Sequence, residues 1–419
     1  MKKLLSVITG LLLVGCVEYK AGPIDWQAEA AALEESAQSV SWTLEDVQVR
    51  AVAFSPELNA LRLKHATSEA KAAASGYWDD PSLDIDVLRV LKEPKNPWTY
   101  GGALSLTLPV TGIPGLERRA AEAYAKADRW DIVAAEYATV SEATALAQNA
   151  MALRRLIAFL DQDRRNEQYR AARQVSERLV EAGEMTRTEL VQQAAADQEL
   201  DHTIFELRNE RLAAETKLRR LTGLPPTCAF DWQAEDVLPE LTTNEVTLLD
   251  FVRAPEVRAA CARHEGKELD LEKEIRRQYP ELSLGPAYTR EDGFDKVGFK
   301  LGLTLPLWNR NRLGIAEANG ARDESRAAAV TAWLDVARRY AEAVQALALT
   351  GDWEIKSARA EADALYEAGE LTAGEYVAVR QQDWTQVVNA HRRRMAACEA
   401  IFKINTLVES LSEEEVTEE

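Results

Sequence analysis

Residues 179–186 read LVEAGEMT, and residues 365–372 repeat this stretch almost unchanged as LYEAGELT. Both copies hold a glycine where a helix can reverse, because glycine adopts the left-handed conformation that ends helices without steric cost. Three further pairs of segments follow the same order: SPEL at 55–58 with APEV at 254–257, DPSL at 80–83 with YPEL at 279–282, and LSLTLPV at 104–110 with LGLTLPL at 301–307. The chain is therefore predicted to be internally duplicated.

The paired segments divide the chain. Each half is predicted to read helix, strand, loop, strand, long helix, glycine turn, long helix. We expect a signal peptide at residues 1–15, a first repeat at 16–222, a second repeat at 223–412 and an acidic tail at 413–419. Residues 116–180 contain neither proline nor glycine, which predicts one continuous helical rod of roughly 95 Å.

The predicted strands have two unlike faces. Apolar and polar residues alternate in 82–87, 104–108 and 301–305, the period of a strand with one apolar side. Two hairpins per chain are too few for a sandwich or a closed barrel, so several chains must pool their strands. Apolar-out, polar-in strands of about ten residues flanked by aromatics are typical of an outer-membrane barrel wall; the aromatics here are Trp98, Tyr100, Tyr288 and Trp308. A soluble hairpin packed on helices is the alternative.

Strand parity predicts which residues face a barrel lumen. The polar positions are Asp84, Asp86, Ser105, Thr107, Lys300 and Thr304. A register error of one residue would reverse this assignment.

The first residues have the layout of an export signal. Lys2 and Lys3 precede an apolar run from residue 4 to 14, too short to span a bilayer. Residues 13–16 read LVGC, which looks like a bacterial lipobox, with Cys16 as the acylated mature N-terminus. Val17 is not aspartate, which in lipoproteins generally favours the outer membrane. An ordinary signal peptide with an incidental cysteine is the alternative.

Composition argues against several other classes. The net charge is -19, with 50 basic and 69 acidic residues and no basic stripe, which disfavours nucleic-acid binding. No nucleophile and base pair, metal cluster or phosphate loop indicates an enzyme, and no cofactor or metal site is expected. The four histidines lack ligand spacing. Cys228, Cys261 and Cys398 are expected as buried thiols, with a bridge between the first two left open.

These segments resemble the TolC-like outer membrane efflux proteins over nearly the whole mature chain. The strand-to-helix signatures LSLTLPV at 104–110 and LTLPLWNRNR at 303–312, the paired glycine turns and the lipobox carry the resemblance. It implies a homotrimer in which four strands per subunit make a twelve-stranded barrel through the outer membrane. The helices would continue it as a periplasmic tunnel that meets an adaptor protein and an inner-membrane pump, for which the RND type is one candidate.

The resemblance also implies roles for single residues. The adaptor-docking tips would be the turns at Gly183, Thr186, Gly369 and Thr372. Glu375, with Glu189, would form an acidic constriction at the tunnel entrance, although Ala378 stands where another acid is common. A carboxylate at a helix start, favoured by the helix dipole, is the plain alternative.

The sequence indicates the class of substrate less directly. The LPLWNRNR segment at 305–312 is similar to a pattern frequent in the heavy-metal branch, which favours metal-cation efflux over drugs or organic solutes. A function of another class, a periplasmic helical adaptor or scaffold lipoprotein, would share the long helices and the lipid anchor. It should contain a lipoyl-like or β-barrel domain between its helical arms, whereas this chain has two hairpins at equivalent places.

Overall fold

The computed structural model describes residues 19–35, 41–89, 91, 98–232, 239–242, 246–291, 293–303, 307–351 and 357–412. The lipobox with Cys16, the lumen candidate Thr304, residues 92–97 of the first strand loop and the acidic tail lie outside the described residues.

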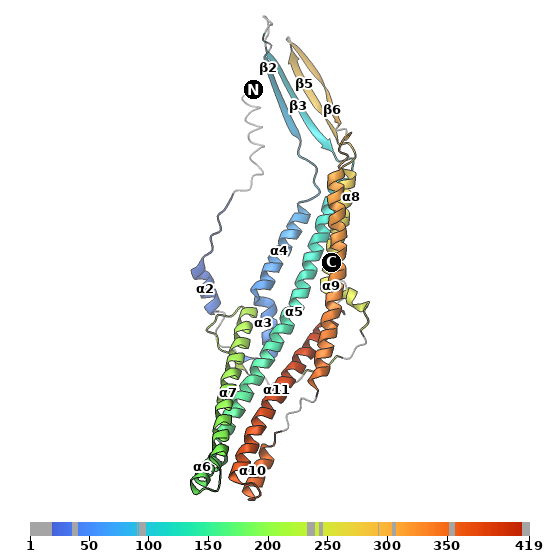
Figure 1. The fold of residues 1–419 in the computed structure, drawn as a ribbon. Coiled ribbons are helices and arrows are strands. Elements are labelled where there is room, and N and C mark those ends of the chain that lie inside the picture. The colour runs from blue at the N-terminus through green and yellow to red at the C-terminus, as the bar shows by residue number, and fades with distance from the viewer. Residues whose placement is uncertain are drawn as a thin grey trace.

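The molecule is elongated, with a sheet at one end and two helical turns at the other (Figure 1). The first half contains α2 (Trp26–Glu35), β1 (Ser41–Trp42), α3 (Leu44–Phe54), α4 (Pro56–Ala73), β2 (Ser82–Arg89), β3 (Trp98–Leu108), α5 (Ile113–Arg164), α6 (Glu167–Ala182) and α7 (Arg187–Leu221). The second half contains β4 (Asp231–Trp232), η1 (Asp250–Arg253), α8 (Pro255–Arg276), β5 (Leu282–Glu291), β6 (Phe294–Leu303), α9 (Arg312–Thr350), α10 (Arg359–Glu367) and α11 (Ala373–Ser410).

The duplication predicted from the sequence is confirmed. The series α4, β2, β3, α5 returns as α8, β5, β6, α9, and the turn between α6 and α7 returns between α10 and α11. Pro56 and Pro255 open equivalent helices, α4 and α8, at the first position. Proline suits that position because the first helical N–H has no partner within the helix.

The single rod predicted over residues 116–180 is wrong. Helix α5 ends at Arg164 and α6 begins at Glu167. The side chain of Asn166 accepts hydrogen bonds from the backbone N–H of Gln168 at 2.8 Å and of Tyr169 at 3.4 Å. Asparagine ends a helix and starts another because its short side chain competes for backbone groups. The break therefore needs neither proline nor glycine.

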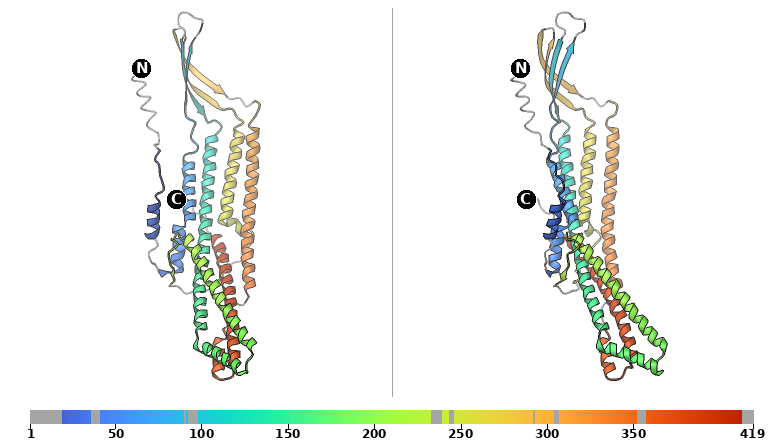
Figure 2. Two further views of the ribbon diagram at one scale, coloured as in Figure 1. Left: turned by 60° about the vertical axis from the view of Figure 1, so that its left-hand side comes forward. Right: turned by 90° about the vertical axis from the view of Figure 1, so that its left-hand side faces the viewer.

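The two hairpins join in one antiparallel sheet with the strand order β2-β3-β5-β6. Strand β3 of the first half pairs with β5 of the second, for example Ala103 with Ala287. Strands β2 and β6 form its two edges. The sheet projects beyond the ends of the helices in all views (Figure 2). Among the described residues, no helix is both long and apolar enough to cross a membrane.

The largest buried cluster lies near the helical turns. It joins α5, α6 and α7 of the first half to α10 and α11 of the second, through residues such as Leu160, Tyr169, Leu207, Ala362 and Trp384. Smaller clusters hold α8 against α5 and α9 against α11. The second half thus packs on the first both near the sheet, through α5 and α8, and near the turns.

Candidate functional site

The sheet has one polar and one apolar face. Residues directly opposite on neighbouring strands point to the same side, and the register aligns Asp84 with Ala103, Ala287 and Gly298 across all four strands. The same face carries Asp86, Ser105, Thr107 and Lys300. The structure thus brings five of the six lumen candidates onto one face, and their place in a lumen stays a prediction.

The other face is apolar and exposed. On β6 it presents Val297, Phe299 and Leu301, with exposed fractions of 83%, 82% and 68%. On β2 the same side carries Leu83, Ile85 and Val87, each more than half exposed. A soluble protein rarely leaves so large an apolar surface in water. The alternative of a soluble hairpin packed on helices does not describe this sheet.

Exposed aromatic side chains lie at both ends of the apolar face. Trp98, Tyr100 and Tyr288 stand near the free end of the strands. At the helical end are Tyr77, Trp78, Tyr279 and Trp308, exposed by 57% to 90%. Sequence reasoning named Trp308 and missed the other three, which lie in short connections before β2 and β5. Two aromatic levels with an apolar band between them match the two interfaces of a membrane.

The first glycine turn is a compact helix reversal. Gly183 has φ of 80° and ends α6. The backbone N–H of Glu184 donates to the Leu179 carbonyl at 2.9 Å. Thr186 then starts α7: its hydroxyl accepts from the Glu189 N–H at 3.3 Å, and the Glu189 carboxylate accepts from the Thr186 N–H at 3.0 Å. This reciprocal cap satisfies two backbone donors that a helix start would otherwise leave unpaired.

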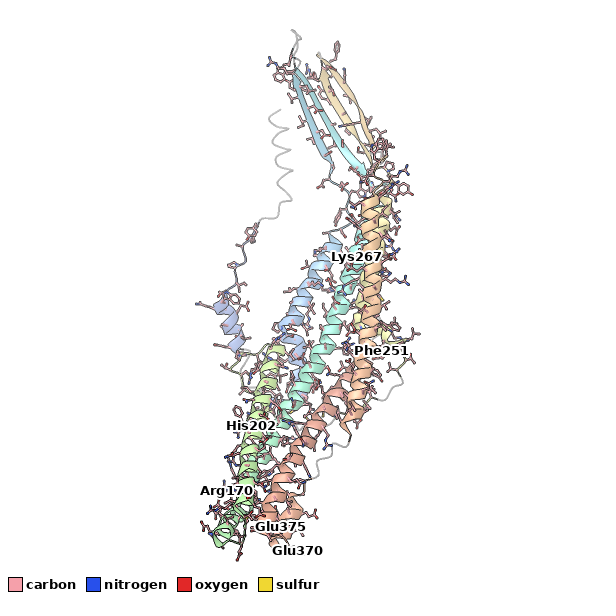
Figure 3. The ribbon with its side chains drawn as sticks, viewed as in Figure 1. Arg170, His202, Phe251, Lys267, Glu370 and Glu375 are labelled. Atoms are coloured by element: carbon pink, nitrogen blue, oxygen red, sulfur yellow. The ribbon has the colours of Figure 1, made fainter. Side chains whose placement is uncertain are left out.

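The second turn repeats this geometry. Gly369 has φ of 73°, and the Glu375 carboxylate accepts from the Thr372 N–H at 2.9 Å and from its hydroxyl at 2.7 Å. These hydrogen bonds lower the pKa of Glu375 below its ordinary value, and the bond from the backbone N–H has the larger effect. Figure 3 shows Glu370 and Glu375 at the end of the molecule opposite the sheet. Both acidic candidates therefore have a local capping role, and a constriction role stays a prediction.

The two turns lie next to each other, but their glycines are not crowded. A side chain built at Gly183 or Gly369 would meet nothing within 4 Å. A Cβ added at Gly374, just inside α11, would lie 3.4 Å from the terminal methyl group of Met185 in the first turn. Gly183 and Gly369 are thus required by their backbone conformation, and the surface around them is open.

A buried ionic cluster lies between the turns and the long helices. Arg380 of α11 is fully buried and contacts Asp163 of α5, which is also fully buried. Asp163 further accepts from the Trp384 indole N–H at 2.5 Å and pairs with Arg359 at 3.1 Å. The second guanidinium arm of Arg380 contacts Asp363. One arginine thereby connects α5 of the first repeat with α10 and α11 of the second.

The next residue of α11 extends the cluster to α6 and α7. The Gln381 amide donates to the Tyr169 hydroxyl at 3.1 Å, to the Gln193 carbonyl at 2.9 Å and to the Asp197 carboxylate at 3.1 Å. Tyr169 donates to Asp197 at 2.5 Å. Residues 380 and 381 therefore bind three helices of the first repeat to the second.

Sequence reasoning missed this cluster. Asp163 stands in the charged run Asp161 to Arg165, which reads as an exposed helix surface. One signal was available on α11: Tyr376, Arg380 and Trp384 follow each other at four-residue spacing on a stripe that also holds Val377 and Val387. An arginine within such a stripe points into a core, where it needs an acidic partner.

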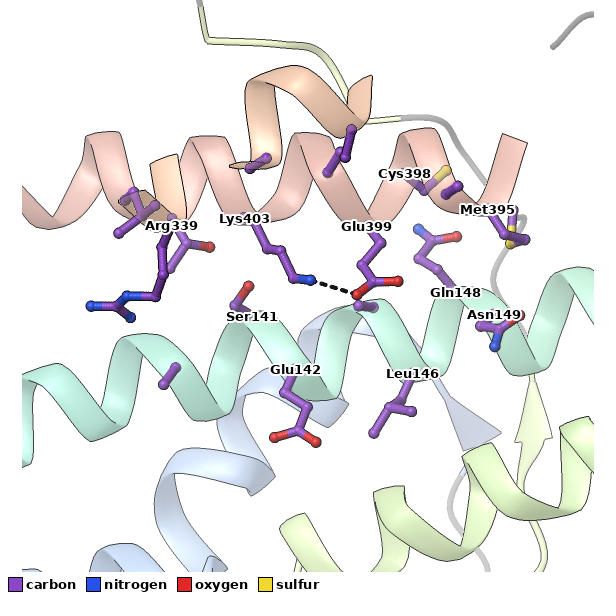
Figure 4. Close-up of a pocket in the computed structure, with 18 of the residues that line it drawn as sticks. Ser141, Glu142, Leu146, Gln148, Asn149, Arg339, Met395, Cys398, Glu399 and Lys403 are labelled. Carbon is purple, nitrogen blue, oxygen red and sulfur yellow. Dashed lines mark hydrogen bonds and ion pairs between the residues drawn. The ribbon is translucent and has the colours of Figure 1, made fainter. Parts of the chain in front are cut away.

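A cavity of about 1050 Å³ lies between α5 and α11, with residues of α7 and α9 at its margin. Glu399 and Lys403 of α11 face it and pair at 2.6 Å (Figure 4). His391 is buried at this cavity, and its burial, helped by Arg394 and Arg392, lowers its pKa to about 4. An imidazole with this pKa is neutral at physiological pH.

Metal-binding chemistry has little support within the described ranges. No group of three or more His, Cys, Asp or Glu there can hold a metal ion. The thiols of Cys228 and Cys261 are not joined by a disulfide, and Cys261 is exposed rather than buried. The expectation of a buried thiol is therefore wrong for Cys261.

Known structures share this architecture. A membrane protein from Pseudomonas aeruginosa matches with a TM-score of 0.71 and 17% identity, over 94% of this chain and 96% of that chain. The channel-forming protein CusC matches with a TM-score of 0.69 and 14% identity, over 94% of this chain and 98% of that chain. The CmeC outer membrane channel of Campylobacter jejuni matches with a TM-score of 0.68 and 15% identity, over 96% and 95%.

Sequence comparison adds no relative, since neither a protein-family model nor a curated protein matches this chain. The likeness lies in the fold and spans nearly the full length of both partners in each of the three pairs. The chain has the fold of the TolC-like outer membrane channels.

Proposed function

We propose that this chain is the outer-membrane channel subunit of a tripartite efflux system and conducts substrate passively. Three copies would close their sheets into one twelve-stranded barrel. The observation that carries the proposal is the exposed apolar face between two aromatic levels, on a sheet that stands clear of the helices. A channel of this kind catalyses no reaction; the inner-membrane pump supplies the energy.

The helices support a periplasmic role. Helix α5 alone has 52 residues, which is about 78 Å at the rise of an α-helix. With the sheet in the outer membrane, the turns at Gly183 and Gly369 would stand far into the periplasm. They would be the surface that meets the adaptor, as the open space around both glycines allows. Glu189 and Glu375 would then lie near the entrance and favour cations.

The lipobox supports the same location. Acylation of Cys16 would tether a subunit whose strands already enter the membrane. We infer that the anchor assists placement and assembly. Cys16→Ser should abolish labelling by palmitate and slow the appearance of trimers, while assembled trimers still fractionate with the outer membrane. Complete loss of the variant to the soluble periplasm would contradict the role of the strands.

For the substrate we propose heavy-metal cations rather than organic solutes. The support is the segment at residues 305–312, together with the acidic turns. Deletion of the gene should lower tolerance to metal cations and leave tolerance to dyes and detergents unchanged. The reverse pattern of tolerance would indicate that the channel exports organic solutes by the same tripartite route.

The decisive experiment is purification of the full chain from membranes. We expect a detergent-requiring trimer from the outer membrane that migrates differently after heating and conducts ions in planar bilayers. A monomer released by salt washing would refute the channel and favour a periplasmic adaptor or scaffold.

A further inference from the structure

The two edge strands of the sheet carry opposite charge on the polar face. Edge β2 carries Asp84 and Asp86, and the opposite edge β6 carries Lys300. The central strands between them have small residues on this face, among them Gly101, Ala103, Gly285 and Ala287. Apart from Glu291 of β5, which pairs with Lys296 of β6 at 2.7 Å near the free end of the sheet, charge on this face is therefore placed where another chain would pair.

Within one chain, Lys300 already contacts the far edge. Its ammonium lies 3.6 Å from the Asp84 carboxylate, although β3 and β5 separate their strands. Three strand spacings span about 14 Å in a flat or gently curved sheet, beyond the combined reach of a lysine and an aspartate. The contact requires a tightly curled sheet, and the small residues of the central strands permit that curl.

A closed barrel of twelve strands does not allow this curl. Four strands cannot close alone, so each edge must pair with an edge of another chain. Strands β2 and β6 run antiparallel to each other, as the three antiparallel pairings require. Pairing β6 of one chain with β2 of the next therefore continues the antiparallel pattern around a ring.

Charge selects this arrangement over its competitors. Pairing β2 with a second β2 would oppose aspartates, which destabilises neighbouring strands, whereas β6 against β2 brings lysine to aspartate. We propose that, in the assembled channel, Lys300 leaves Asp84 of its own chain and pairs with the Asp84 and Asp86 edge of a second copy. The pair guides the pairing of the two edges. This inference rests on the proposed trimeric channel.

Both side chains are about half exposed, at 57% for Lys300 and 50% for Asp84. Exposed ion pairs add little stability, but they discriminate between correct and incorrect neighbours. The pair is therefore expected to affect assembly more than the folding of one chain.

The first test is cross-linking of the full chain in outer membranes. The exposed thiol is removed by Cys261→Ser. Lys300→Cys is then combined with Asp84→Cys or Asp86→Cys and treated with a bifunctional maleimide that spans about 8 Å, the separation of diagonal cross-strand neighbours. Covalent dimers and trimers are expected on denaturing gels. Single-cysteine variants, and Lys300→Cys combined with Ser283→Cys on β5, which adjoins β6 of the same chain, should remain monomers.

The oligomeric state separates the two ways in which cross-linking can fail. Protein that is a trimer by size-exclusion chromatography in detergent, but shows only monomers on denaturing gels after cross-linking, would overturn the inference and leave the channel proposal standing. Material that never sizes as a trimer would refute the channel proposal itself.

Charge reversal provides the second test. Lys300→Glu should lower the temperature at which trimers dissociate, as should Asp84→Lys with Asp86→Lys, and the three changes together should restore it. Asp295→Asn serves as the control, because this carboxylate of β6 lies on the opposite face and accepts from the Tyr288 hydroxyl. Dissociation at the unmodified temperature in all variants would overturn the inference.

Discussion

Removal of the Arg380 side chain should destabilise the helical end of the molecule. In Arg380→Met, Asp163 stays fully buried and, among the residues that the structure describes, keeps only Trp384 at 2.5 Å and the partly exposed Arg359 at 3.1 Å. Breaking a buried ion pair costs roughly 3 to 5 kcal/mol, because one charge is left without its partner. The loss should fall near the lower end of that range, since Arg359 continues to pair with Asp163.

A second substitution separates this cause from lost packing. Adding Asp163→Leu to Arg380→Met removes both charges, and replacing a buried pair by apolar residues is often neutral or stabilising. The double variant should therefore be more stable than Arg380→Met alone. Asp363 does not reverse this expectation, because its side chain is 23% exposed and still accepts from the Tyr376 hydroxyl at 2.6 Å.

The assay is thermal loss of the helical circular-dichroism signal in detergent, at one scan rate because membrane proteins often unfold irreversibly. Arg164→Met is the matched control, since Arg164 pairs with Asp201 at the surface, where such pairs contribute less than about 1 kcal/mol. A melting temperature of Arg380→Met equal to that of Arg164→Met would refute the reasoning, as would a double variant less stable than the single one.

Three further results are expected. Gly183→Val and Gly369→Val force a branched side chain into positive φ, a strain of roughly 1 to 2 kcal/mol, and should weaken cross-linking to the adaptor in cells while trimers persist; loss of trimers instead would assign these glycines to the fold. Glu375→Gln should reduce cation selectivity in single-channel recordings, and unchanged selectivity would remove Glu375 from the entrance. In the unmodified chain the lowered pKa keeps Glu375 ionised, so its cap should weaken only as pH falls below 4.5, the ordinary pKa of a glutamate. His391 has a pKa lowered from 6.5 to about 4, so the folded state loses stability as pH falls from 6.5 towards 4, by up to about 1.4 kcal/mol per pH unit. His391→Gln should therefore reduce the slope of stability against pH in this range. An unchanged slope would contradict the burial of a neutral imidazole.

The order of the elements could be predicted from the sequence because the two halves of the chain can be compared with each other. Matching prolines and glycines mark the same helix starts and turns in both halves, so each half tests the other. Strand parity placed Asp84, Thr107 and Lys300 on one face for a similar reason, since the period of two is a local property of the chain.

Other features depend on contacts between distant residues and were not predictable in the same way. The pairing of β3 with β5 joins residues of the two repeats that lie 174 to 190 positions apart, and no local pattern indicates which strands become neighbours. The break at Asn166 shows that a side-chain cap can end a helix whose composition favours continuation. Asp163 looks like a surface charge until the packing of α11 on α5 brings it to Arg380.

The caps at the two turns affect how fast the proposed partner can bind. At both turns the threonine and glutamate side chains already accept from the backbone N–H of the cap residue and of the third helical residue. A partner that docks here as proposed would therefore meet helix starts that are already ordered. Docking on turns that are already in this form would need no local unfolding, so no folding step would slow assembly of the complex.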